Sequence, residues 1–213
     1  MLFVLVSYIC VFGVLNLAER LTKNKKIPAE LGRKAPHVAA ATIVALWPIF
    51  TNYKVIIIAS ILHMAAAWYV RQIGYFNHIR SVGRLTHGEF YFASGIIITA
   101  LMNPPAWAFM IAILHMGYAD AMAALVGTAK GRRHKFSIFG QTKSVEGSLA
   151  FFVTSVILTG VGMLVVAPAG LGSAWLVTLL VPLTSTMLEM VCIYGLDNIL
   201  VPVFVASVLS QLA

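Results

Sequence analysis

Long apolar stretches alternate with short polar loops along the whole chain. Eight apolar stretches lie near residues 2–18, 36–50, 53–70, 88–102, 105–128, 146–167, 173–190 and 197–212. A helix needs about 20 residues to cross the hydrocarbon core of a bilayer, so the shorter stretches are expected to tilt, to re-enter or to extend into their flanks. The pattern predicts an all-α bundle of seven or eight transmembrane helices, which forms one integral membrane domain over residues 1–213.

The basic residues give this bundle an orientation. The chain has 15 Lys and Arg residues, and all of them except Lys54 fall on one side of the predicted helices. Because cytosolic loops are rich in Lys and Arg, we expect that side to face the cytosol and both termini to lie outside. The same distribution accounts for the net charge of +8 without nucleic acid as a partner. With 60% hydrophobic and 10% charged residues, the composition excludes a water-soluble domain.

The acidic residues point to a functional site on the same side. All 7 Asp and Glu residues map to that side or to the half of the membrane beneath it, which the rule for basic residues does not predict. The outward-running helices begin there as well, near Pro36, His87, Ser144 and Asp197. Helix N-termini together with Lys and Arg form good phosphate sites. We therefore expect a phosphate-binding site at the cytosolic face of a cell or organelle membrane.

Asp120 is an acidic residue inside an apolar helix. A carboxylate within a membrane segment costs about 2.5–3.5 kcal/mol on insertion scales, so it is a functional candidate by default. Small residues surround it, including Gly117, Ala121 and Gly127. Small residues favour close helix packing, and they also leave room for a ligand. The structural alternative is an ion pair that braces two helices; we favour a metal-binding or catalytic role.

A basic loop and a polar helix start follow Asp120. Lys135 belongs to the loop, and Lys143, Ser144 and Glu146 open the next apolar stretch. Ser144 suits an N-cap and Glu146 suits a first turn, so alone these residues describe only a helix start. Together with Asp120 and the basic loop they favour a phosphate site, although their spacing is not that of a P-loop.

Asp197 and Asn198 follow Glu189 and precede the last apolar stretch. They suit a helix N-cap. They equally suit a second carboxylate site for Mg²⁺ opposite Asp120, because magnesium usually takes one or two protein carboxylates together with substrate phosphates and water. Both interpretations stay open from the spacing alone.

A fourth polar group stands just before the second apolar stretch and contains Glu30, Arg33, Lys34 and His37. The residues form either a solvated cluster at the membrane edge with an i,i+4 pair or a set of phosphate contacts. The pattern by itself slightly favours the solvated cluster.

Together these residues resemble the polyprenol kinase family, which includes dolichol kinase, phytol kinase and the CTP-dependent diacylglycerol kinases and is related to phosphatidate cytidylyltransferase. The matching segments are Glu30-Leu31-Gly32-Arg33-Lys34-x-x-His37, Ala119-Asp120-Ala121 through Gly127, His134-Lys135-Phe136, Lys143-Ser144-Val145-Glu146-Gly147-Ser148, and Glu189 with Gly195-Leu196-Asp197-Asn198-x-x-x-Pro202. These segments follow the family's order over most of the chain.

The resemblance implies a membrane phosphotransferase that moves a phosphoryl group from CTP to an isoprenoid alcohol, phytol-like or polyprenol-like, or to diacylglycerol, with Mg²⁺ as cofactor. By motif match, Asp120 and Asp197 would hold the metal ion. Lys143 and Lys135 would hold phosphates, and Glu146 would position the loop or the metal. The further candidates for nucleotide binding are Ser144, Arg33, Lys34 and His37, and those for a supporting role are Glu30, Glu189 and Asn198.

Two other functions are alternatives. A phosphatidate cytidylyltransferase shares the need for CTP and Mg²⁺, but its Pro-Gly-His-Gly-Gly segment is missing near the C-terminus. A lipid transporter would explain intramembrane acids and proline-containing helices, but its polar residues should reach the midplane. The lipid's identity, CTP over UTP or ATP, and the catalytic base stay open, as does a homodimer, the commonest assembly.

Overall fold

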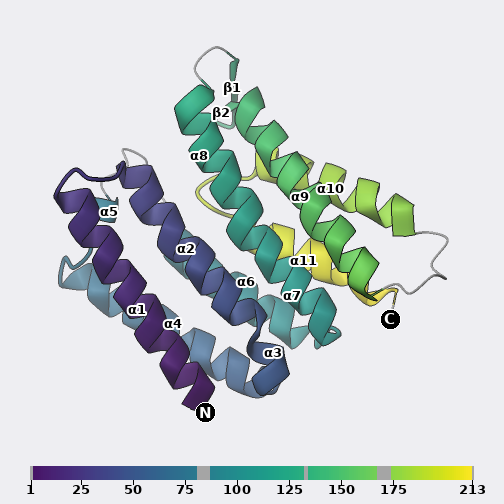
Figure 1. The fold of residues 1–213 in the computed structure, drawn as a ribbon, viewed down its shortest axis with the longest axis horizontal. Helices are drawn as coiled ribbons and strands as arrows, with labels where there is room; N and C mark the ends of the chain where they lie inside the picture. The colour runs from purple at the N-terminus through teal and green to yellow at the C-terminus, as the bar shows by residue number, and fades with distance from the viewer. Residues whose placement is uncertain (1, 81–86, 132–133, 167–173, 213) are drawn as a thin grey trace.

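The computed structural model describes residues 2–80, 87–131, 134–166 and 174–212, which are almost entirely helical (Figure 1). The helices are α1 (Leu2–Lys23), α2 (Ala29–Ala45), α3 (Trp47–Phe50), α4 (Tyr53–Gln72), α5 (Asn77–Arg80), α6 (Gly88–Leu101), α7 (Ala106–Leu114), α8 (Asp120–Lys130), α9 (Val145–Val166), α10 (Ala174–Val191) and α11 (Asp197–Ser210). A π-helical segment, His115–Ala119, joins α7 to α8, and the strands β1 (Lys135–Ile138) and β2 (Gln141–Ser144) precede α9. Each predicted apolar stretch coincides, over most of its described residues, with one or more of these helices, which confirms an all-α membrane bundle.

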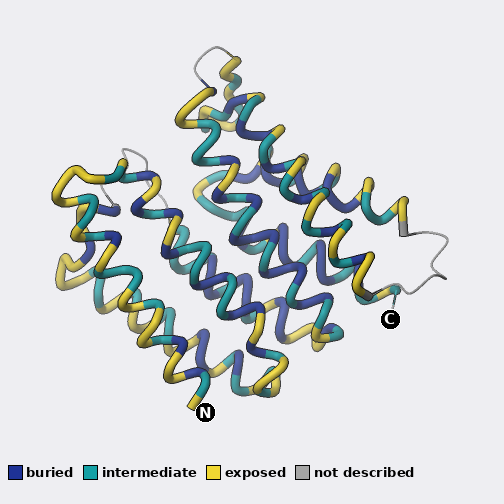
Figure 2. Tube along the Cα trace, in the orientation of Figure 1, coloured by how far each residue is buried: buried dark blue, intermediate teal, exposed yellow. Residues whose placement is uncertain are grey.

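One long span lies at the centre of the bundle. Among the described residues, four helical spans are long and apolar enough to cross a membrane: Leu2–Lys23, Tyr53–Gln72, Ala106–Lys130 and Val145–Val165. The span Ala106–Lys130 is the central one: 56% of its most apolar stretch is buried, against 17%, 17% and 28% in the other three. We call it the central span. Figure 2 shows the exposed positions gathered on the outer helices, where an apolar surface would contact lipid.

Two apolar clusters pack against this central span. The first joins α7 to α1, α2, α3, α4 and α6, and it includes the buried side chains of Ile56, Phe92 and Phe109. The second joins the span to α9, α10 and α11 through Phe151 and Val205. The helices therefore form two groups that both pack on the central span, and α6 of the first group also contacts α11 of the second (Figure 1).

Two glycines let neighbouring helices approach closely. A Cβ atom at Gly117 would overlap the side chain of Ala41, and one at Gly95 would overlap the backbone carbonyl of Asn198. The first contact seats α2 against the π-helical segment, and the second seats α6 against the start of α11. The small residues next to Asp120 thus serve close helix packing, and this packing fixes what surrounds the carboxylate.

A β-hairpin before α9 is an addition to the predicted helical bundle. β1 and β2 pair antiparallel, with Phe136 opposite Lys143 and Ile138 opposite Gln141. The turn residues Phe139 and Gly140 have φ angles of 47° and 76°, as in the type I′ turns that match the twist of a hairpin. The hairpin lies at the end of the molecule opposite to both termini (Figure 1). Part of the predicted basic loop is therefore a ribbon that leads into α9.

Candidate active site

Asp120 begins α8 at the point where α2 meets the central span. Its Oδ2 accepts a hydrogen bond from Nζ of Lys34, and Nε2 of His37 lies 3.3 Å from the same oxygen. The side chains of Lys34 and Asp120 are 3% and 15% exposed. The ion pair of the structural alternative is therefore present. Oδ1 of Asp120 accepts no hydrogen bond from the part of the chain that the structure describes, so it is available to a ligand.

The π-helical segment directly precedes Asp120 and so affects the direction in which the side chain of Asp120 projects from the central span. A π turn contains one residue more than an α turn and so rotates everything that follows, and such segments are frequent at functional sites. His115 anchors it: Nδ1 lies 2.8 Å from the carbonyl oxygen of Ile111, and Nε2 lies 3.2 Å from Oγ1 of Thr159. This fully buried histidine supports the site from behind and does not line it.

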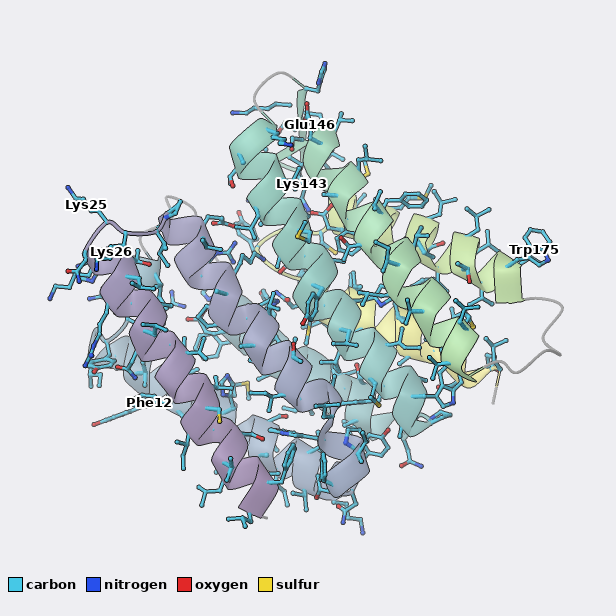
Figure 3. The ribbon with its side chains drawn as sticks, viewed as in Figure 1. Phe12, Lys25, Lys26, Lys143, Glu146 and Trp175 are labelled. Atoms are coloured by element: carbon cyan, nitrogen blue, oxygen red, sulfur yellow. The ribbon has the colours of Figure 1, made fainter. Side chains whose placement is uncertain are left out.

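Lys143 extends from β2 to the end of α10. Its Nζ donates to Oε1 of Glu189 at 2.5 Å and also to the backbone carbonyl of Glu189. Figure 3 shows Lys143 within the bundle between α8 and α9. The neighbouring Ser144 is buried, and its Oγ accepts a hydrogen bond from the backbone N–H of Gly147 at 3.1 Å. Ser144 thus makes the helix-start contact expected from the sequence, while Lys143 faces the interior.

These residues surround a polar cavity of about 650 Å³. The predicted site residues that line it are Arg33, Lys34, Asp120, Lys135, Lys143, Ser144, Glu189, Asp197 and Asn198. Gly127, Gly131, Gly140 and Gly147 also line it. Ser144 packs against Gly127, Gly131 and Gly147, whereas the space beside Gly140 is open, so a ligand can approach the bare backbone there. The volume is within the range of about 300–1,000 Å³ that is typical of small-molecule sites.

Asp197 brings a second carboxylate to this cavity. Within the described ranges it makes no hydrogen bond or ion pair, and its charge is repelled by that of Asp120. Oε2 of Glu189 and Oδ1 of Asn198 are buried there without a hydrogen-bond partner among the described residues. Buried polar atoms are rarely left unsatisfied, so the arrangement suits a bound ion or ligand.

The donor set limits what kind of ion would fit. No group of three or more His, Cys, Asp or Glu side chains in the described part of the chain is arranged to hold a metal. A site for zinc or for a fully enclosed cation is therefore not seen there. Two carboxylates that leave the remaining positions to phosphate and water are the usual environment of Mg²⁺.

A second cavity, of about 880 Å³ and mainly apolar, lies between α1, α2, α4 and α6. It shares four lining residues with the polar cavity: Arg33, Gly88, Asp120 and Asn198. The two cavities therefore meet where α2, α6, α8 and α11 converge. Among the described residues, this junction is where a ligand in one cavity could contact a ligand in the other.

Three predicted residues lie outside the polar cavity. His37 lines the apolar cavity alone. Glu30 pairs with Arg33 at 2.5 Å, and Glu146 pairs with His134 at 2.7 Å; neither acid lines either cavity. Figure 3 shows Glu146 close to the hairpin. This location suits the role of positioning the loop better than that of binding the metal.

A relative among known proteins supports the sequence motifs. A phytol kinase from Synechocystis sp. is 32% identical over 203 residues, which are 89% of this chain and 82% of that protein. This chain belongs to the polyprenol and phytol kinase family. Membership places it among kinases with an alcohol acceptor. No family model and no solved structure matches the chain.

The sequence motifs of the polyprenol and phytol kinase family do not include most of the residues that form the walls of the apolar cavity in this chain. Arg71 and Glu89 form an ion pair of 3.2 Å beside it, and Tyr8 and Phe92 line it. Glu89 lies in the first turn of α6, where an acidic residue is favourable in any helix, and nothing in the sequence distinguishes Tyr8 or Phe92 from other apolar positions. Such walls arise only when separate helices pack together.

Proposed function

We propose that this protein is a lipid-alcohol kinase that transfers the γ-phosphoryl group of CTP to an isoprenoid alcohol such as phytol, at the cytosolic face of a membrane. The main support is the junction of a polar and an apolar cavity at Arg33, Gly88, Asp120 and Asn198. A polar cavity suits a nucleotide, and an apolar cavity suits a lipid tail. The shared wall would bring their reacting ends together, and the phytol kinase relative indicates the kind of acceptor.

The nucleotide phosphates would lie in the polar cavity beside Lys135 and Lys143. Phosphoryl transfer depends mainly on positioning and on neutralising the charge of the transferred group. Lys143 is held by Glu189 in the structure, so phosphate binding would exchange one anionic partner of Lys143 for another. Gly140 in the hairpin turn lines the same cavity, and the space beside its Cα is open, so its bare backbone could contact phosphate oxygens.

Asp120 and Asp197 would hold Mg²⁺. When bound, the ion would neutralise phosphate charge. The available Oδ1 of Asp120 and the lack of a partner for Asp197 among the described residues fit this role. Lys34, which lines the same cavity, would hold Asp120 in place through Oδ2.

The alcohol would enter the apolar cavity from the bilayer. Ile9 and Phe12 of α1 and Leu62 of α4 line the cavity and are also exposed on the outer surface, so the cavity reaches the side of the bundle. The hydroxyl group would lie at the shared wall near Asp120. Asp197 lines only the polar cavity, so it would approach the reacting atoms from the side of the nucleotide.

The transfer itself breaks one bond and forms another. The hydroxyl oxygen of the alcohol would bond to the γ-phosphorus, and the bond from that phosphorus to the β–γ bridging oxygen would break. CDP would leave, and the hydroxyl proton would pass to a carboxylate or to water. Asp120 lines the junction of the two cavities, whereas Lys143 and Asp197 line the polar cavity alone, so they would act on the nucleotide.

An assay with purified protein, CTP and Mg²⁺ tests the proposal. Phytol, polyprenol, diacylglycerol and phosphatidate are offered in separate reactions, and the nucleotide product is identified. CDP together with a lipid monophosphate, formed only with an alcohol, is the expected result. Pyrophosphate formed with phosphatidate would establish nucleotidyl transfer instead. Lipid movement across liposomes without nucleotide consumption would establish a transporter.

A further inference from the structure

A small void of about 20 Å³ lies directly beyond the apolar cavity. Five residues line both spaces and form the boundary between them: Tyr8, Val11, Ala40, His63 and Phe92. The far side of the void is formed by Ser7, Val44 and Trp47, among others. The void is too small for a lipid chain, yet it continues the space that a chain would occupy.

The order of the lining residues gives the cavity a direction. Along α2, Arg33 lies at the junction with the polar cavity, Ala40 at the boundary, and Val44 in the void alone. At 1.5 Å per residue the boundary lies about 10 Å from Arg33, and Val44 lies about 6 Å further. An alcohol whose hydroxyl group is at the junction would therefore extend its tail toward the boundary.

Tyr8 is held rigidly at this boundary. Its hydroxyl donates to the backbone carbonyl of Ala59 on α4 at 2.6 Å. Its ring centroid lies 6.1 Å from that of His63, with an interplanar angle of 19°, and 6.0 Å from that of Trp47. Buried tyrosines usually need such a partner for the hydroxyl. Contacts to α3 and α4 thus fix a bulky ring from α1 at the end of the cavity.

We propose that Tyr8 is the floor of the acceptor cavity and limits how much of the alcohol's tail the enzyme binds. This inference rests on the proposed function, because it needs the alcohol in the apolar cavity. In the wild type, kcat/KM should rise with tail length until the tail reaches Tyr8 and then level off. A smaller side chain would join the cavity to the void and let longer tails gain further contacts.

The expected effect follows from methylene burial. Each additional buried methylene group strengthens binding about fourfold. Two more methylene groups would therefore shift the preference for long over short alcohols about fifteenfold. We expect Tyr8→Ala to raise the ratio of kcat/KM between a long and a short alcohol at least about tenfold.

The experiment measures kcat/KM for a series of linear isoprenoid alcohols of increasing length. Tyr8→Ala is compared with the wild type, and Tyr8→Leu is measured beside it in case the alanine variant does not fold. Tyr8→Phe keeps the ring, so its kcat/KM should level off at the same tail length as that of the wild type. Phe12→Ala is the matched control, because Phe12 is an aromatic residue of α1 that lines the cavity but not the void.

Three outcomes separate the two proposals. A larger long-to-short ratio in Tyr8→Ala or Tyr8→Leu, but not in Phe12→Ala, supports Tyr8 as the floor. An unchanged length profile in folded Tyr8 variants, while the wild type phosphorylates alcohols, overturns the role of Tyr8 and leaves the kinase function intact. A folded wild type that phosphorylates no alcohol overturns the proposed function and the floor with it.

Discussion

Replacing Lys34 distinguishes the two roles of Asp120: its ion pair with Lys34, which braces two helices, and its proposed role as a metal ligand. Lys34→Met removes a partner whose side chain is only 3% exposed and leaves the carboxylate of Asp120 inside the protein. Breaking a buried pair by removing one partner destabilises a protein by about 3–5 kcal/mol. Nε2 of His37 remains 3.3 Å from the carboxylate, so we take the lower end, about 3 kcal/mol. For a chain of this size the melting temperature should fall by about 6–12 °C.

The double variant Lys34→Met/Asp120→Leu removes both charges at once. Apolar replacement of a whole buried ion pair is often neutral or stabilising, so most of the lost melting temperature should return. Phosphoryl transfer should be lost in the double variant, because Asp120 is the proposed metal ligand at the junction of the two cavities. Stability and activity would then respond in opposite ways to the second substitution.

Both properties are measured on the same purified protein. Thermal unfolding in detergent reports stability, and CDP release reports turnover. Lys54→Met is the matched control, since Lys54 is exposed and lines neither cavity. A double variant that turns over at nearly the wild-type rate would refute the reasoning and reduce Asp120 to a brace. An unchanged melting temperature in Lys34→Met would refute the estimate for the ion pair.

Three further substitutions test other parts of the site. Lys143→Ala should lower kcat about 100-fold to 1,000-fold, as expected for the loss of one group that stabilises transition-state charge, and wild-type CDP release would remove Lys143 from the mechanism. His134→Ala and Glu146→Gln should each raise KM for CTP severalfold by loosening the hairpin. Their double variant should do no more, because the two side chains form one ion pair; multiplied effects would show independent roles. Gly95→Ala should destabilise the fold by about 1–3 kcal/mol, since its Cβ would overlap the backbone of α11; an unchanged melting temperature would contradict this packing.

The helices follow directly from the apolar pattern, because a segment inside a bilayer must satisfy its own backbone hydrogen bonds. The residues at which the helices begin and end are predicted less well by the apolar pattern. α2 begins at Ala29, well before the apolar stretch predicted from residue 36. The added helical turns contain Arg33 and Lys34, and they place both side chains toward the central span. Hydropathy could not show this, since polar residues beyond the apolar stretch can continue a helix.

Asp120, Lys143 and Asp197, which the sequence motifs single out, line one cavity; that they bind a nucleotide and a metal ion stays a prediction. The pairing of Lys34 with Asp120 was not foreseen, because it joins residues 86 positions apart and no local pattern shows which helices become neighbours. The same limit applies to Tyr8, whose sequence context is that of any lipid-facing helix. Motifs indicate chemistry, whereas partners and cavity walls depend on tertiary packing.

The most direct test of the central claim is to follow the label of CTP that is radiolabelled at the γ-phosphate or at the α-phosphate. With an isoprenoid alcohol and Mg²⁺, the account predicts that the γ-label enters the lipid as a monophosphate and that the α-label remains in CDP. If the α-label enters the lipid and the γ-label leaves as pyrophosphate, or if folded protein transfers neither, the assignment as a lipid-alcohol kinase is wrong.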